Sequence, residues 1–159
     1  MPVIELSTVI RAPRERVFDL ARSIDAHQDT TGGTEERAVA GVTRGLIGMD
    51  GEVTWEARHF GVRQRLTVRV TAFDRPKHFQ DIMISGAFKS MVHDHEFSEH
   101  PTGTWMRDRF EFKSPLGILG KIADWLLLTS YMRRFLVHRN EVLKQLAESS
   151  AWSRYLEHT

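Results

Sequence analysis

The stretch from Leu116 to Glu148 reads LGILGKIADWLLLTSYMRRFLVHRNEVLKQLAE, and its apolar residues recur at the period of an α-helix. One apolar stripe includes Ile118, Ile122, Trp125 and Met132, and a second lies about a quarter-turn away around the helix. A helix with two apolar stripes is covered by protein on more than one side. The pattern therefore predicts one long helix around which the rest of the chain packs.

Ser114 and Pro115 set the predicted start of this helix, because serine caps helix N-termini and proline suits the first helical position. Two roles are open for this helix: it belongs simply to the core, or its first half, Ile118 to Met132, covers a cavity. A chain of 159 residues is long enough for one domain with its own core. We expect a single domain over residues 1–148 and a short tail over residues 149–159.

Composition excludes several classes of protein. The chain has no cysteine, which rules out disulfides, thiolate metal sites and cysteine nucleophiles and favours a reducing cytoplasm. The 22 basic and 21 acidic residues give a net charge of +1, too small for a field that attracts nucleic acid or anionic lipid. The N-terminus lacks a signal-peptide pattern, and no apolar run is long enough to span a bilayer. We therefore expect a soluble, cytoplasmic protein without an integral membrane segment.

The residues before the long helix predict one strand, two short helices and six further strands. Apolar alternation indicates a strand over Val3 to Ile10, a helix opens at Pro13 and runs to about Ile24, and a short helical turn spans Asp25 to Asp29. Short turns separate the later strands, which favours an antiparallel meander. The six predicted strands are Thr34 to Ala40, Glu52 to Phe60, Val62 to Phe73, His78 to Ser85, Phe88 to Glu99 and Gly103 to Phe112.

This order of elements resembles the helix-grip fold of the START-like (SRPBCC) superfamily. Arg11-Ala12-Pro13 followed by Val17-Phe18 is similar to the opening common in that superfamily. The runs His93 to Phe97, Gly103 to Asp108 and Pro115 to Gly117 are similar to its polyketide cyclase/dehydrase-like branch. The resemblance implies an α+β fold: a curved seven-stranded antiparallel sheet around a long C-terminal helix, with two short helices between the first two strands. Members bind sterols, lipids, polyketides, quinones and other apolar molecules between sheet and helix, and some are cyclases or hydrolases.

Alternation along the strands also indicates which side chains face the long helix. Leu66, Val68 and Val70 alternate with arginines and threonines, which places Gln64 on the same inner face. The same rule places polar side chains among apolar ones on other strands, and Asp81 joins them if its apolar neighbours point inward. The polar residues predicted on the inner face are His59, Gln64, Asp81, His93, His95 and Asp108.

The inner polar group has three possible roles: its members bond to one another within the core, they orient the polar end of a ligand, or they bind a metal or catalyse a reaction. An unpaired buried polar group costs about 1–3 kcal/mol, so these residues are expected to bond to one another, to water or to a ligand. His93 and His95 point the same way and, with His59 and Asp108, would suit zinc or iron. A His-x-His pair is nevertheless common by chance among eight histidines, so we expect no metal and no cofactor. His93, His95 and Asp108 are also candidates for acid-base catalysis. The hypothesis that the protein is an enzyme depends on the family resemblance alone.

The expected function is binding of a small apolar or amphipathic molecule of lipid, quinone, isoprenoid or polyketide type between sheet and helix. The alternatives are a cyclase, dehydratase or hydrolase that uses the inner histidines and aspartate, and a protein-interaction module with a filled core. No nucleic acid is expected as a partner, and the protein is expected to be a monomer or homodimer. The predicted ligand-binding residues are Trp55, His59, Gln64, Asp81, Met91, His93, His95, Phe97, Met106, Asp108, Phe110, Ile122, Trp125 and Met132.

Overall fold

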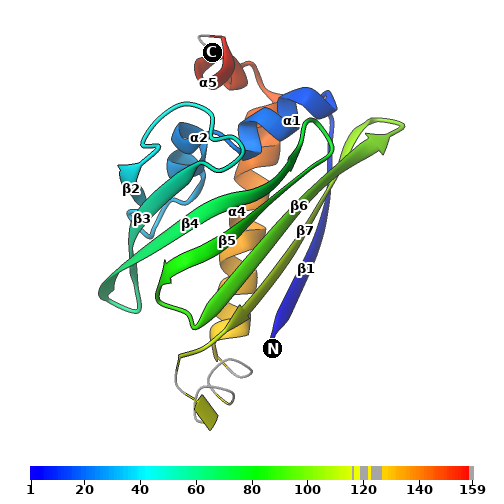
Figure 1. The fold of residues 1–159 in the computed structure, drawn as a ribbon. Coiled ribbons are helices and arrows are strands. Elements are labelled where there is room, and N and C mark those ends of the chain that lie inside the picture. The colour runs from blue at the N-terminus through cyan, green and yellow to red at the C-terminus, as the bar shows by residue number, and fades with distance from the viewer. Residues whose placement is uncertain (116, 119–121, 123–126, 158–159) are drawn as a thin grey trace.

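In the computed structural model, seven strands form one antiparallel sheet that curves around a C-terminal helix (Figure 1). The structure describes residues 1–115, 117–118, 122 and 127–157. The strand order across the sheet is β1-β7-β6-β5-β4-β3-β2, so the first strand pairs with the last and the others follow as a meander. This confirms the predicted α+β helix-grip architecture. The strands are β1 (Val3–Ile10), β2 (Arg37–Gly41), β3 (Glu52–His59), β4 (Val62–Asp74), β5 (His78–Gly86), β6 (Ser90–His100) and β7 (Gly103–Lys113).

Two short helices, α1 (Arg14–Ala21) and α2 (Ile24–Thr30), connect β1 to β2, as predicted. Pro13 precedes α1, where its fixed φ suits the approach to a helix. Ser23 caps α2, because its Oγ accepts a hydrogen bond of 3.2 Å from the backbone N–H of Ala26.

The C-terminal helix α4 spans Thr129–Glu148, so its end agrees with the predicted end. Residues 127–128 form a wider helical turn before it, and residues 117–118 and 122 are helical. The predicted start near Pro115 falls in a stretch of which residues 116, 119–121 and 123–126 lie outside the described residues. The regular helix that the structure describes is therefore shorter than the predicted one at its N-terminal end.

The space between sheet and α4 is filled at the end where α1 lies. Phe18 of α1 is fully buried and meets the rings of Phe73, Phe79 and Phe97 edge-on at 5.2–5.4 Å between centroids. Such edge-to-face contacts are the favoured geometry of aromatic pairs. Because α1 closes this end of the fold, an internal cavity has to lie toward the other end.

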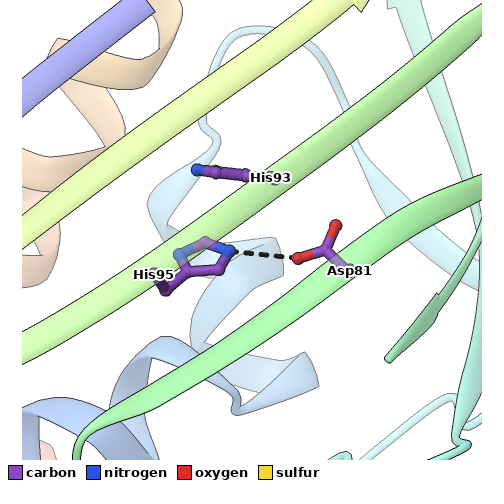
Figure 2. Close-up of side chains that lie close together, drawn as sticks. All are labelled: Asp81, His93 and His95. Carbon is purple, nitrogen blue, oxygen red and sulfur yellow. Dashed lines mark hydrogen bonds and ion pairs between the residues drawn. The ribbon is translucent and has the colours of Figure 1, made fainter. Parts of the chain in front are cut away.

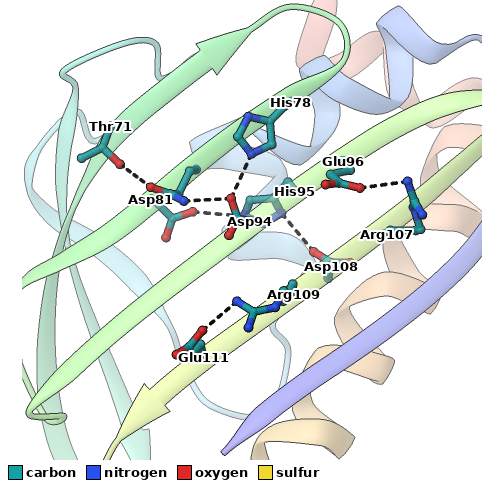
Figure 3. Close-up of polar contacts among 11 residues, drawn as sticks. Thr71, His78, Asp81, Asp94, His95, Glu96, Arg107, Asp108, Arg109 and Glu111 are labelled. Atoms are coloured by element: carbon teal, nitrogen blue, oxygen red, sulfur yellow. Dashed lines mark hydrogen bonds and ion pairs between the residues drawn. The ribbon is translucent and has the colours of Figure 1, made fainter. Parts of the chain in front are cut away.

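The outer face of the sheet carries paired charges in contact with solvent (Figure 3). Arg107 binds Glu96 at 2.9 Å, and Arg109 binds Glu111 at 2.7 Å. Exposed pairs of this kind contribute little to stability. Across β6 and β7, Asp94 lies opposite Arg109 and Glu96 lies opposite Arg107, so this outer face carries both acids and bases.

Residues after α4 fold back onto α1 (Figure 1). The 3₁₀ turn η2 (Ser150–Trp152) and the short helix α5 (Ser153–Leu156) follow directly. The guanidinium of Arg16 lies 4.1 Å from the centre of the Trp152 ring, and the Tyr155 hydroxyl donates a hydrogen bond to Asp29. Among the helices that the structure describes, none is long and apolar enough to cross a membrane.

Candidate functional site

A cavity of about 470 Å³ lies between the sheet and α4. Most of its wall is apolar, because the inward-facing positions of β3, β4, β6 and β7 carry valine, methionine and aromatic side chains. Phe60 and Leu127 also line it and are 64% and 70% exposed, so they mark where the cavity reaches the surface. The principal apolar walls are Val53, Trp55, Val68, Val70, Met91, Phe110, Met132, Phe135 and Leu136.

Not all of the predicted ligand-binding residues line the cavity. Phe97 and Met106 face inward but pack in the filled core beside α1. Asp108 is buried behind the two histidines, Ile122 is 57% exposed, and Trp125 lies outside the described residues. The predicted residues that line the cavity are Trp55, His59, Gln64, Asp81, Met91, His93, His95, Phe110 and Met132.

Strand pairing brings two histidines and two aspartates together on the inner face. Antiparallel register places Asp81 of β5 opposite His93 of β6, and His95 of β6 opposite Asp108 of β7. The hydrogen bonds run diagonally: His93 Nε2 donates to Asp108 Oδ1 at 3.0 Å, and His95 Nε2 donates to Asp81 Oδ1 at 3.0 Å. His95 Nδ1 also lies 3.0 Å from Asp108 Oδ1, within ion-pair distance but without the angle of a hydrogen bond. These four side chains form one network, which we call the His-Asp cluster.

The helix α4 contributes two further polar side chains to this cluster. Asn140 Nδ2 donates to Asp108 Oδ2 at 2.7 Å, and Arg139 Nη1 lies 4.0 Å from Asp108 Oδ1. Both residues are at least 95% buried. Sequence reasoning missed them, although a signal was present. Between Leu136 and Leu143 the apolar stripe of the helix is interrupted for one turn, and the polar residues 139–140 occupy that turn.

The cluster divides its charges between the two imidazoles. Burial and the neighbouring charge of His95 lower the pKa of His93 to about 4, although Asp108 opposes this. Burial would also lower the pKa of His95, but contacts with Asp108 and Asp81 outweigh it and raise that pKa above its ordinary value. Burial works against the ionised form of Asp108, yet the hydrogen bond from His93 and the contact with His95 hold its pKa well below the usual range. His93 is therefore neutral at pH 7, while Asp108 is ionised.

A second group of polar side chains lines the cavity wall formed by α2, β3 and α4. The His59 ring and the Tyr131 hydroxyl are hydrogen-bonded at 2.6 Å, and Glu36 Oε1 lies 3.3 Å from His27 Nε2. The His27 ring stacks on Trp55 with 4.2 Å between centroids. The other carboxylate oxygen of Glu36 is buried and has no hydrogen-bond partner among the described residues. Sequence reasoning missed Glu36, which lies within the strand predicted over Thr34 to Ala40 but directly precedes β2 in the structure.

The arrangement is suited to three kinds of chemistry. An apolar cavity with polar groups on its wall can orient the polar end of an amphipathic molecule. An imidazole that lies between two carboxylates, as His95 does, can hold or move a proton. Asp81, His93 and His95 bring donor atoms within 4.8 Å of one another, close enough to share one metal ion (Figure 2). His59 and Asp108, which the sequence grouped with the histidines as possible metal ligands, are not in this set.

Comparison with known families gives one match that spans most of the chain. A family model described as polyketide cyclase / dehydrase and lipid transport matches residues 1–148. No curated protein matches the chain at a significant level.

Solved structures share the fold at low sequence identity. A Thermus thermophilus protein has a TM-score of 0.77 and 20% identity, covering 94% of this chain and 100% of that protein. A START superfamily protein from Mycobacterium smegmatis has a TM-score of 0.69 and 10% identity, covering 92% and 97%. A major latex-like protein from Panax ginseng has a TM-score of 0.69 and 14% identity, with the same two coverages. At these identities the likeness demonstrates the fold alone.

Proposed function

The chain belongs to the polyketide cyclase, dehydrase and lipid transport family, and from this premise we propose that it binds a small apolar or amphipathic molecule. The proposed binding site is the cavity between the sheet and α4. The single observation that carries the proposal is the cavity itself, with about 470 Å³ of space inside a largely apolar wall. Pockets for small molecules usually have volumes of about 300–1,000 Å³, and a core filled by side chains would have left no such space.

The shape of the wall favours a ligand with an apolar body and a polar end. Val68, Met91 and Phe110 offer apolar surface, and methionine adapts easily to different ligand shapes. Arg139 and the His-Asp cluster supply donors and a positive charge at one part of the wall. A lipid, quinone, isoprenoid or polyketide with an oxygen-bearing end fits this combination.

Native mass spectrometry of the protein purified from cells tests the proposal directly. We expect a fraction of the molecules to carry an extra mass that disappears on denaturation and corresponds to an apolar compound. A binding assay with the apolar dye anilinonaphthalene sulfonate then locates the site. The variant Val68→Phe places a larger side chain in the cavity and is expected to weaken dye binding by at least about tenfold, because overpacking and lost space both oppose the ligand.

The matched control is Val92→Phe, the same exchange on the outer face of β6, where the side chain is partly exposed. This variant is expected to bind the dye as the parent protein does. Equal affinities for all three proteins, or the absence of both a copurified compound and dye binding, would refute the proposed cavity function.

A further inference from the structure

Three side chains of the His-Asp cluster converge on one point of the cavity wall (Figure 2). Asp81 comes from β5, and His93 and His95 come from β6, two residues apart and therefore on the same face of the sheet. One potential ligand atom of each residue lies within 4.8 Å of the others. All three residues line the cavity, so a ligand in the cavity has access to the same point.

Asp108 lies close to both rings and orients the ring of His93 through a hydrogen bond. It accepts the His93 Nε2 proton at 3.0 Å, which leaves Nδ1 of that ring with its lone pair. It also lies 3.0 Å from His95 Nδ1, although without the angle of a hydrogen bond, so that nitrogen can keep the ring proton when Nε2, which faces Asp81, loses its own to coordinate a metal ion. Asn140 holds Asp108 in turn through a hydrogen bond of 2.7 Å. A carboxylate that fixes the tautomer of ligating histidines is a regular outer-shell feature of metal sites.

The charges at this point favour a cation. Asp81 and Asp108 contribute two negative charges, and Arg139 contributes one positive charge 4.0 Å from Asp108. With His93 and His95 neutral, these groups sum to one negative charge inside a largely apolar cavity. In the metal-free protein a proton between His95 Nε2 and Asp81 Oδ1 compensates that charge.

We propose that Asp81, His93 and His95 form a binding site for one divalent transition-metal ion of the zinc or iron(II) type, with its open coordination positions facing the cavity. Two imidazoles and one carboxylate suit these ions, whereas magnesium and calcium prefer oxygen ligands alone. The proposal goes beyond the binding of an apolar molecule and does not depend on it. It also revises the expectation from the sequence that no metal is bound.

Metal binding exchanges the proton between His95 and Asp81 for the dication. The Nε2 lone pair and an Asp81 oxygen become ligands, and the proton passes to solvent. The site then carries one net positive charge, counting Asp81, Asp108, Arg139 and the ion. An anionic oxygen, either hydroxide or a group of a bound molecule, would complete the coordination from the cavity side.

Cobalt(II) and zinc(II) are the probes for this site, used on the full chain without an affinity tag. Metal-free protein is titrated with cobalt(II), with visible d-d absorption as the readout, and with zinc(II) in a calorimeter. We expect one ion per chain. The variants Asp81→Asn and His93→Gln are expected to weaken binding by more than about 100-fold, because even outer-shell changes typically cost 10–100-fold.

The control is a second His-Asp pair on the opposite face of the same two strands. His78 Nε2 lies 2.9 Å from Asp94 Oδ1, and among the described residues no third histidine, cysteine or carboxylate joins them to form a possible metal site. His78→Gln is therefore expected to leave the affinity for cobalt(II) and zinc(II) unchanged. The outer-face pair is drawn in Figure 3.

X-ray absorption on the zinc-loaded parent protein keeps the test decisive if a cluster variant does not fold. Two imidazole scatterers around the ion support the proposed ligands. Fewer than two imidazoles, no saturable binding by the parent protein, or binding by Asp81→Asn and His93→Gln equal to that of the parent would overturn the proposal.

Discussion

At the scale of single residues, Asp108 is the centre of the buried polar network. Its side chain is 1% exposed, and it accepts hydrogen bonds from His93 and Asn140 while facing His95 and Arg139. A buried carboxylate without such partners would be strongly destabilising, so these neighbours explain why an ionised group is tolerated here. The two imidazoles have opposite preferences: burial and the charge of His95 keep His93 neutral, whereas the contacts with Asp108 and Asp81 favour protonation of His95.

These opposite preferences predict opposite pH effects on the stability of the metal-free protein. The pKa of His93 is about 4 in the fold, against about 6.5 unfolded, so acidification between these values favours the unfolded chain. The stability deficit of His93→Gln should therefore shrink between about pH 7 and pH 5. The pKa of His95 is raised, so its stabilisation is fully present below about pH 6.5 and is lost as pH rises through the folded pKa. The deficit of His95→Gln should grow over the same acidification.

Urea unfolding of the parent and both variants at several pH values measures these trends. Imidazole nitrogen shifts in NMR spectra serve as an independent control, with His93 expected to stay neutral down to about pH 4. The same pH trend for both variants would contradict the assigned protonation states.

At the scale of elements, α4 combines an apolar stripe with one polar turn. Met132, Leu136 and Leu143 are buried against the sheet, and the turn at residues 139–140 points its polar groups at the His-Asp cluster. The helix therefore closes the cavity and completes the cluster at once. A helix face of this kind positions its polar residues more rigidly than a loop would.

Asn140→Ala is expected to lower the free energy of unfolding by about 1.5–3 kcal/mol. This variant removes a hydrogen bond to a charged group and leaves Asp108 Oδ2 without that donor. The control on the same helix is Gln145→Ala, whose exposed side chain donates to Glu141 at 3.3 Å and is expected to cost less than about 0.5 kcal/mol. Chemical denaturation measures both free energies of unfolding. Similar losses for the two variants would show that the buried hydrogen bond stabilises the fold no more than the exposed one.

At the scale of the whole molecule, the space between sheet and helix is divided into a filled end and an open end. Phe18 and Phe97 fill the end covered by α1, and Val53 and Phe110 line the open end. The residues after α4 pack on the outside of α1, away from the open end (Figure 1). The tail thus packs at the filled end, and none of its described residues lines the cavity.

A chain that ends at Glu148 is therefore expected to fold and to keep its affinity for the dye and for zinc. Its melting temperature should fall by a few degrees, because the contacts of Trp152 and Tyr155 with Arg16 and Asp29 are lost. Circular dichroism and the binding assays described above test this. A chain that fails to fold without residues 149–159 would show that the tail is an integral part of the domain.

The sequence by itself determined the order of the elements and, for the strands with clear alternation, which side faces inward. Alternation is a local property of the chain, so the burial of Met91 and His93 on β6, or of Asp108 on β7, follows from neighbours along the same strand. The helical period likewise located the end of α4 at Glu148. The order of strands and helices along the chain was enough to indicate the family, because the family's fold has the same order.

Only the tertiary structure decided which inward residues share a site. Register between strands brings Asp81 to His93 and Asp108 to His95, and the packing of α4 brings Asn140 to Asp108 from 32 positions along the chain. Alternation cannot distinguish the two ends of one inner face, so Phe97 was predicted at the cavity although it packs beside α1. These outcomes depend on contacts between distant segments, which no local period records, and for that reason the three-donor site emerged only from the folded chain.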